Sequence, residues 1–273
     1  MKDIKDVVKE KYTKIVNLTK QQNETSCFGA NSGCCGVDYT IFSENYEKLQ
    51  GYNSEADLGL GCGLPTEYAK IKKGDTVIDL GSGAGNDCFV ARAIVGETGL
   101  VIGIDFTEAM INKATENADK LGFKNVQFRL GDIEKIPVAA NKADVVISNC
   151  VLNLVPNKNK AFSEIYRVLK CKGHFSISDV VLSGNLPENI AKAAEMYAGC
   201  ISGAIQKDEY LSIIQQIGFV NIQIQKEKQI VIPNEILLKY LTNMELEEFK
   251  RANIGIFSIT VYAEKPDCND VCC

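Results

Sequence analysis

A short apolar segment runs directly into three glycines at alternating positions, and this arrangement constrains the fold more than any other feature of the chain. The segment is Thr76–Leu80, and the glycines are Gly81, Gly83 and Gly85. Glycine lets a backbone turn sharply and approach a ligand where a Cβ atom would collide. A strand, such a turn and then a helix are typical of the ligand-binding edge of a doubly wound α/β sheet.

The residues after this turn alternate between apolar runs and amphipathic helical patterns. We predict further strands at 100–105, 126–130, 143–149 and 174–179, and helices at 87–95, 109–121, 158–169 and 208–217. Apolar strands separated by helices predict a mostly parallel sheet covered on both faces. Two late runs, 220–231 and 254–263, predict long strands that complete a seven-stranded sheet at its edge.

The remaining segments suggest a three-part organisation. We expect residues 1–182 to form a cofactor-binding domain with an N-terminal helix over 1–20 and a cysteine-containing loop. Residues 183–267, which include a predicted helix over 189–199, are expected to complete the sheet and bind substrate. Residues 268–273 are expected to form a flexible, cysteine-rich tail.

Charge and hydropathy exclude several classes of function. The net charge of −5 and the pI of about 5.2 give no basic surface of the kind that grips nucleic acid. No apolar run reaches the roughly 18–20 residues that cross a bilayer. The charged N-terminus is not typical of a secretory signal, so we expect a cytoplasmic protein without a membrane or nucleic-acid partner.

Cysteine is unusually common. The chain has 11 cysteines and a single histidine, His174. An odd number of cysteines in a chain without an export signal argues against a structural disulfide framework. Any soft-metal site must therefore consist mostly of thiolates, because imidazole ligands are nearly absent. We expect Cys88 to fill the core, Cys171 to be an incidental exposed thiol, and His174 to be structural.

The glycine turn fits two cofactors. An acidic residue at the end of the second strand, Asp105, is placed to accept the hydroxyls of a ribose. A dinucleotide site prefers G-x-G-x-x-G, whereas here the third glycine is Gly85 and Asn86 occupies the sixth position. This spacing, with Asp79 before it, resembles motif I of class I S-adenosylmethionine-dependent methyltransferases over about residues 70–180. The resemblance implies a Rossmann-like methyltransferase fold and cofactor contacts at Asp79, Gly81, Ser82, Gly83, Gly85, Asp105, Met110, Asp132, Ile133 and Asn149.

Three segments outside the glycine turn each carry one cysteine. Cys62 precedes the first strand, Cys150 follows the fourth, and Cys200 lies in a segment placed to cover the site. With the motif Asp-Leu-Gly-Ser-Gly-Ala-Gly-Asn-Asp-Cys88, these phrases resemble arsenite methyltransferases over about residues 30–205. The resemblance implies that Cys62, Cys150 and Cys200 bind As(III), and that Cys34 or Cys35 takes part in binding or disulfide exchange.

The implied chemistry is methyl transfer from S-adenosylmethionine to arsenite or methylarsenite held by thiolates. Methylation formally oxidises arsenic, so a thiol reductant such as glutathione or thioredoxin is expected as co-substrate and partner. Three alternatives stay open: another small-molecule methyltransferase of the quinone or sterol type, a non-catalytic thiol protein that sequesters arsenic or metal, and an NAD-linked oxidoreductase. The oxidoreductase is disfavoured by Asn86 and by the lack of a clear acid for hydride transfer.

Overall fold

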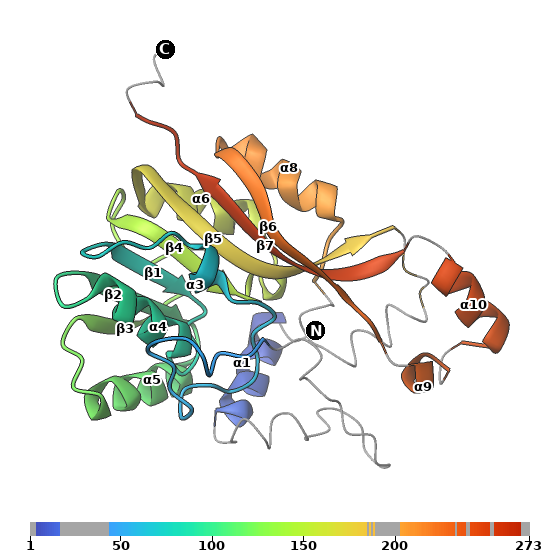
Figure 1. Cartoon of the computed structure of the whole chain (residues 1–273), viewed down its shortest axis with the longest axis horizontal. Helices are drawn as coiled ribbons and strands as arrows, with labels where there is room; N and C mark the ends of the chain where they lie inside the picture. The colour runs from blue at the N-terminus through green and yellow to red at the C-terminus, as the bar shows by residue number, and fades with distance from the viewer. Residues whose placement is uncertain are drawn as a thin grey trace.

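One sheet organises the part of the chain that the computed structural model describes, namely residues 4–16, 44–184, 186, 188, 203–232, 234–238, 241–251 and 254–268. The sheet has seven strands in the order β3-β2-β1-β4-β5-β7-β6 (Figure 1). Their bounds are β1 Thr76–Leu80, β2 Leu100–Asp105, β3 Val126–Leu130, β4 Ala143–Asn149, β5 Leu169–Ser183, β6 Val220–Ile230 and β7 Gly255–Glu264.

Helices connect most of these strands. Their bounds are α1 Ile4–Ile15, α3 Pro65–Tyr68, α4 Asn86–Val95, α5 Glu108–Lys120, α6 Lys158–Val168, α8 Lys207–Ile217, α9 Asn234–Leu237 and α10 Asn243–Arg251, with a 3₁₀ turn, η2, at Leu152–Leu154. Among the described residues no helix is long and apolar enough to cross a membrane.

The register confirms the predicted doubly wound topology. Strand β1 is third in the sheet and pairs in parallel with β2 and β4, so that Ile78 lies opposite Ile102 and Val146. The two late strands are antiparallel: β7 pairs with β5 from His174↔Glu264 to Ser183↔Gly255, and β6 pairs with β7 at the edge. The strand order reverses at β1 and β4, which is the place where such sheets bind ligands.

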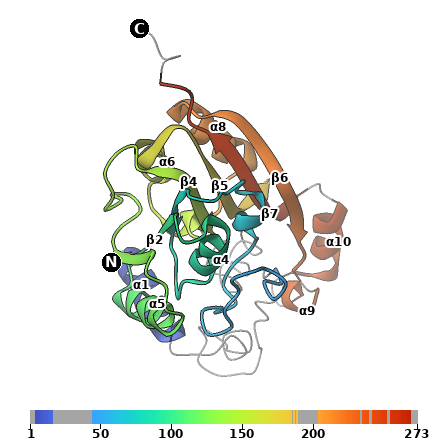
Figure 2. The same ribbon diagram turned by 60° about the vertical axis from the view of Figure 1, so that its left-hand side comes forward.

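Successive side chains along the strands point to opposite faces of the sheet and are buried in two separate clusters. Val77 and Val101 are buried in a cluster with α4, α5 and α1, whereas Ile78 and its neighbours face a second cluster with α6 and α8. Helix α1 lies beside α5 in both ribbon views (Figure 1 and Figure 2). Helices therefore cover both faces, as continuous apolar strands require.

A third, smaller cluster contains two of the three predicted arsenic-binding cysteines. It joins Cys62 and Cys150 to apolar residues from β5, β6, β7, α9 and α10. Helices α9 and α10 lie beyond the paired ends of β6 and β7 in Figure 1. Neither helix was predicted from the sequence, because one has four residues and the other nine, and such short segments carry little periodic signal.

The described structure departs from the sequence predictions in β5. This strand spans 15 residues, whereas we predicted 174–179. Its ten-residue pairing with β7 extends it beyond the stretch that pairs with β4. The predicted helix over 189–199 and the last residues of the predicted 1–20 helix lie outside the described residues.

Our prediction that Cys171 is an incidental exposed thiol was wrong. Cys171 forms a disulfide with Cys268, with their Cα atoms 5.5 Å apart. The first residues of β5 lie against the chain after β7, where the Lys172 amide donates to the Lys265 carbonyl over 3.1 Å. This pairing brings together two cysteines 97 residues apart, a distance in sequence that no local pattern reveals. Residues 269–273 of the predicted flexible tail lie outside the described residues.

Candidate cofactor and thiol site

The glycine turn between β1 and α4 lines a cavity at the carboxyl ends of the parallel strands. Gly81, Gly83 and Gly85 have φ values of +72°, +51° and +99°, which favour glycine over any other residue. A Cβ atom at Gly81 would collide with Val151, whereas a Cβ atom at Gly83 would meet open space. The turn therefore presents bare backbone to the cavity at Gly83.

Carboxylates stand at the ends of three neighbouring strands. Asp79 lies in β1, Asp105 ends β2, Asp132 follows β3, and all three line the cavity. Asp105 accepts hydrogen bonds from the amides of Gly83 (3.1 Å) and Thr107 (2.8 Å). Burial raises the pKa of Asp105, and these amide hydrogen bonds partly oppose the shift. The carboxylate is thus fixed by two backbone donors beside the glycine turn.

The cavity is lined by carboxyl groups. Its walls carry carboxylates at Asp57, Asp79, Asp87, Asp105 and Asp132, and among the described lining residues there is no lysine, arginine or histidine. A dinucleotide brings two phosphates, which such a lining repels, whereas S-adenosylmethionine carries a sulfonium and an ammonium group, which it attracts. The lining therefore favours S-adenosylmethionine over NAD.

Polar and apolar groups both fit an adenosyl ligand. Ser82 lines the cavity, and among the described residues its buried Oγ has no hydrogen-bond partner. Met110, which is 1% exposed, and Ile133 are apolar residues of the cavity wall. All the residues that the sequence predicted as cofactor contacts line the cavity except Gly85.

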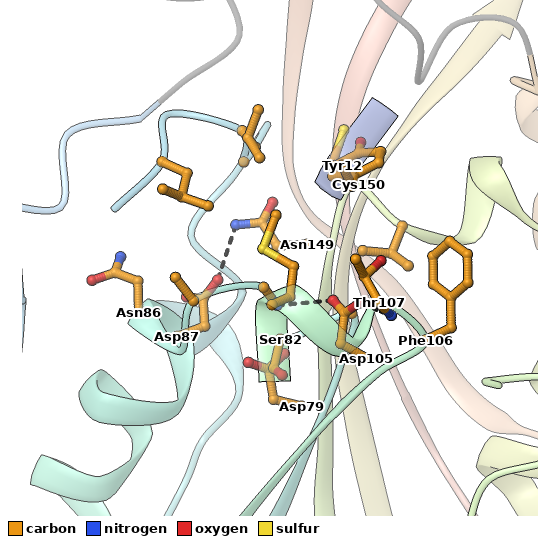
Figure 3. A pocket seen from close by; sticks show the side chains of 18 of the residues that line it. Tyr12, Asp79, Ser82, Asn86, Asp87, Asp105, Phe106, Thr107, Asn149 and Cys150 are labelled. Atoms are coloured by element: carbon orange, nitrogen blue, oxygen red, sulfur yellow. Dashed lines mark hydrogen bonds between the residues drawn. The ribbon is translucent and has the colours of Figure 1, made fainter. Parts of the chain in front are cut away.

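Asn149 joins the cavity to the loop that carries Cys62. Its Oδ1 accepts hydrogen bonds from the amides of Cys62 (3.0 Å) and Gly63 (3.3 Å), and its Nδ2 donates to the Gly63 carbonyl (2.8 Å). The same Nδ2 contacts Oδ2 of Asp87 at 3.2 Å (Figure 3). Asn149 thus holds a turn 87 residues away in sequence against the end of β4.

Sequence reasoning missed Tyr46 and Asp87. The Tyr46 hydroxyl lies 3.0 Å from Oδ2 of Asp87 and 3.1 Å from the Gly63 carbonyl, and it also accepts from Asn149. Asp87 had a usable signal, because it is an acidic residue in the first turn of the helix that follows the glycines. Tyr46 had none, because neither periodicity nor a motif marks the segment in which it lies.

The two described site thiols lie in the same environment. Cys62 and Cys150 are 2% and 4% exposed and belong to one apolar cluster, so water has little access to either. Cys150 also lines the cofactor cavity. Because the Cys62 amide is bonded to the side chain of the residue before Cys150, the structure brings together two of the three predicted thiols.

The backbone at Cys150 has an unusual conformation. Its φ is +61°, in the left-handed region that a residue with a side chain seldom adopts. The Cys150 amide donates to the Ser178 carbonyl of β5 over 2.8 Å, which holds the turn in place. Non-glycine residues in this conformation concentrate at functional sites, and here the turn marks the change from β4 to η2.

Other predicted residues fall elsewhere. Cys88 is fully buried and its thiol donates to Oδ2 of Asp79 over 3.2 Å; burial first, and Asp79 second, raise the pKa of this thiol well above its usual value. Nε2 of His174 lies 2.6 Å from the Ala69 carbonyl, which fits a structural role. Cys200, Cys34 and Cys35 lie outside the described residues. Within the described residues no group of three potential ligands is close enough to hold a metal ion.

Comparison with known proteins defines the class. A family described as "Methyltransferase domain" matches residues 71–218, which extend from just before β1 to the end of α8. Together with the fold and the carboxyl-lined cavity, this match makes the chain an S-adenosylmethionine-dependent methyltransferase.

Its relatives define the family. The arsenite methyltransferase of Halobacterium salinarum is 38% identical over 98% of this chain and 68% of its own length. The human arsenite methyltransferase is 38% identical over 76% of this chain and 57% of its own. The crystal structure of an arsenic(III) S-adenosylmethionine methyltransferase from Chlamydomonas reinhardtii has 33% identity and a TM-score of 0.63, covering 76% of this chain and 68% of that one. The chain therefore belongs to the arsenite methyltransferase family, and it spans between 57% and 68% of the length of these relatives.

Proposed function

We propose that this protein transfers methyl groups from S-adenosylmethionine to trivalent arsenic held by cysteine thiolates. The observation that carries the proposal is the position of Cys150. Its thiol belongs to the cofactor cavity and also to the apolar cluster that contains Cys62. A substrate atom bound to these thiols is therefore presented beside the place where the methyl donor binds.

Thiolates suit arsenite because both the ligand and the metalloid are soft. Arsenous acid loses its three hydroxyls as water when it takes up three thiols, since each thiol proton leaves with one hydroxyl. The enclosed setting of Cys62 and Cys150 favours this exchange, because the sulfurs are poorly hydrated and lose little on binding.

Cys200 is proposed as the third ligand from the family resemblance, and the end of its segment supports this. Gly203, three residues later, is held by Nζ of Lys158, which donates to the Gly203 carbonyl over 2.8 Å. A Cβ atom at Gly203 would collide with the backbone of Asn153, three residues after Cys150. Three residues span at most about 10 Å, so chain connectivity permits Cys200 to reach the thiol pair. We propose Cys34 or Cys35 as a further site thiol.

The transfer needs little from the protein beyond placement. S-adenosylmethionine, when bound, supplies an electrophilic methyl group. The thiolates orient the arsenic lone pair toward the cavity, and no general base is required because that atom carries no proton. The residues around Cys62 and Cys150 exclude water from the reacting atoms.

A reductant must complete each turnover. Methyl transfer converts As(III) formally to As(V), and two thiols return the two electrons by forming one disulfide and releasing two protons. We propose glutathione or thioredoxin as the source, and a cytoplasmic location where such thiols are kept reduced. We also propose the division into a cofactor-binding part, 1–182, a substrate-binding part, 183–267, and a tail, 268–273.

The test is to incubate the protein with arsenite, glutathione and S-adenosylmethionine and to measure methylarsenicals by chromatography with elemental detection. We expect product with the unaltered chain and none with Cys62→Ser, Cys150→Ser or Cys200→Ser, while cofactor affinity stays within about twofold. Cys88→Ser is the matched control, because it removes an equally buried thiol that contacts Asp79 instead.

Two results would contradict the proposal. If arsenite binds tightly but no methylarsenical forms with the cofactor bound, the chain sequesters arsenic. If arsenite does not bind while cofactor does, the substrate is a different small molecule, such as a quinone or sterol.

A further inference from the structure

One carboxylate oxygen at the cofactor cavity lacks a partner. Oδ2 of Asp87 accepts from Nδ2 of Asn149 (3.2 Å) and lies 3.0 Å from the Tyr46 hydroxyl. Its other oxygen, Oδ1, is enclosed and has no hydrogen-bond partner among the described residues. Asp87 lines the cavity (Figure 3).

The surroundings of Asp87 make an added positive charge favourable. Burial raises the pKa of Asp87 to about 6, although hydrogen bonds from Asn149 and Tyr46 oppose the shift. Burial and then the charge of Asp87 raise the pKa of Asp79 well above its usual value. Two enclosed carboxyl groups thus repel each other, and no lysine, arginine or histidine among the described lining residues offsets them. A cationic ligand would stabilise both in their charged forms.

The same carboxylate is connected to the Cys62 turn. Asn149 donates to Asp87 with its Nδ2 and accepts from the amides of Cys62 and Gly63 with its Oδ1. Tyr46 adds a second link, because its hydroxyl contacts both Asp87 and the Gly63 carbonyl. Anything that fixes the charge and orientation of Asp87 therefore acts on the turn through two hydrogen-bonded side chains.

We propose that Oδ1 of Asp87 pairs with a positive group on the methionine half of S-adenosylmethionine, and that Asp87 then tightens the Cys62 turn through Asn149. Asp87 is a cofactor-binding residue in this account, and Asn149 is a positioning residue. The inference rests on the proposed function only in treating Cys62 as a substrate thiol. Its cofactor half needs no arsenic.

The first experiment measures binding by calorimetry without arsenic. Asp87→Asn keeps the shape of the side chain but removes its charge. We expect its affinity for S-adenosylmethionine to fall about tenfold or more, the size of a charge-assisted hydrogen bond, and its affinity for 5′-methylthioadenosine, which has neither an ammonium nor a sulfonium, to stay unchanged. Of these two positive groups, S-adenosylhomocysteine keeps only the ammonium. If Asp87→Asn weakens its binding as much as that of S-adenosylmethionine, Asp87 pairs with the ammonium. If the loss of affinity is smaller, Asp87 pairs with the sulfonium.

A second carboxylate on the same wall is the matched control. Asp57 also lines the cavity, but its Oδ1 already accepts from the Gly59 amide over 3.0 Å. We expect Asp57→Asn to lower the affinity for S-adenosylmethionine by about threefold or less. The proposal is overturned if Asp87→Asn does not weaken S-adenosylmethionine, if it weakens all three ligands equally, or if Asp57→Asn has the same effect as Asp87→Asn.

The second experiment tests the link to Cys62 and begins with the unaltered chain. The rate of Cys62 alkylation is measured by peptide mass spectrometry with saturating S-adenosylmethionine or 5′-methylthioadenosine. We expect S-adenosylmethionine to slow the labelling of Cys62 at least about threefold more than 5′-methylthioadenosine, and Asp87→Asn to abolish that difference. Equal protection by the two ligands in the unaltered chain would overturn the coupling, whatever the outcome with arsenite.

Discussion

Replacing Asn149 by alanine tests whether one side chain holds the thiol loop to the sheet. The substitution removes the acceptor of the Cys62 and Gly63 amides and the donor to the Gly63 carbonyl. A buried backbone group left without a partner costs about 1–3 kcal/mol. With two amides affected and some rehydration of the loosened turn, we expect Asn149→Ala to lower the free energy of unfolding by about 2–4 kcal/mol.

The assay is urea denaturation followed by circular dichroism, without cofactor. A domain of this kind is stable by about 5–15 kcal/mol, so the variant should remain folded and its midpoint should shift measurably. Asn45→Ala is the control. The Asn45 side chain accepts from the Glu47 amide over 2.8 Å at an exposed position, and its loss should cost less than about 1 kcal/mol. Equal destabilisation by the two substitutions would refute the role given to Asn149.

Three further predictions follow from other described groups. Asp105→Ala should weaken S-adenosylmethionine by about tenfold or more through loss of two charge-assisted hydrogen bonds to ribose; unchanged affinity in calorimetry would show that the ribose contact is misplaced. Burial raises the pKa of Asp179 to about 7, so the folded state binds a proton that the unfolded state has already released, and stability should fall as pH rises from about 4 to 7. Asp179→Asn should flatten that part of the curve, and a curve that keeps its slope would exclude Asp179 as the cause. Cys171→Ser should lower the unfolding free energy by about 2–4 kcal/mol in the absence of reductant, and adding a reductant to the unaltered chain should have the same effect; a variant as stable as the oxidised chain would argue against the disulfide with Cys268.

Local sequence patterns were sufficient to predict the strands and helices around the cofactor cavity. The apolar run of β1 and the glycines after it were predicted with their bounds, because burial on both faces and positive φ values limit the choice of residues there. The carboxylates at the ends of β1 and β2 followed from the same pattern, since parallel strands end at one edge of the sheet.

Contacts between distant segments could not be predicted in this way. The bond from the Cys62 amide to Asn149 spans 87 residues and depends on how the loop before β1 lies on β4. The Cys171–Cys268 disulfide and the full length of β5 both depend on pairing with β7 or the residues after it. Tyr46 reaches Asp87 from an irregular segment, where neither periodicity nor a motif marks it.

The central claim is that the site cysteines bind one arsenic atom beside the methyl donor. X-ray absorption spectroscopy of the protein loaded with one equivalent of arsenite measures this coordination directly. We predict a first shell of sulfur only in the unaltered chain, and the replacement of one sulfur by an oxygen in Cys62→Ser and in Cys150→Ser. An arsenic shell that contains oxygen in the unaltered chain, or that is identical in all three proteins, would contradict the account.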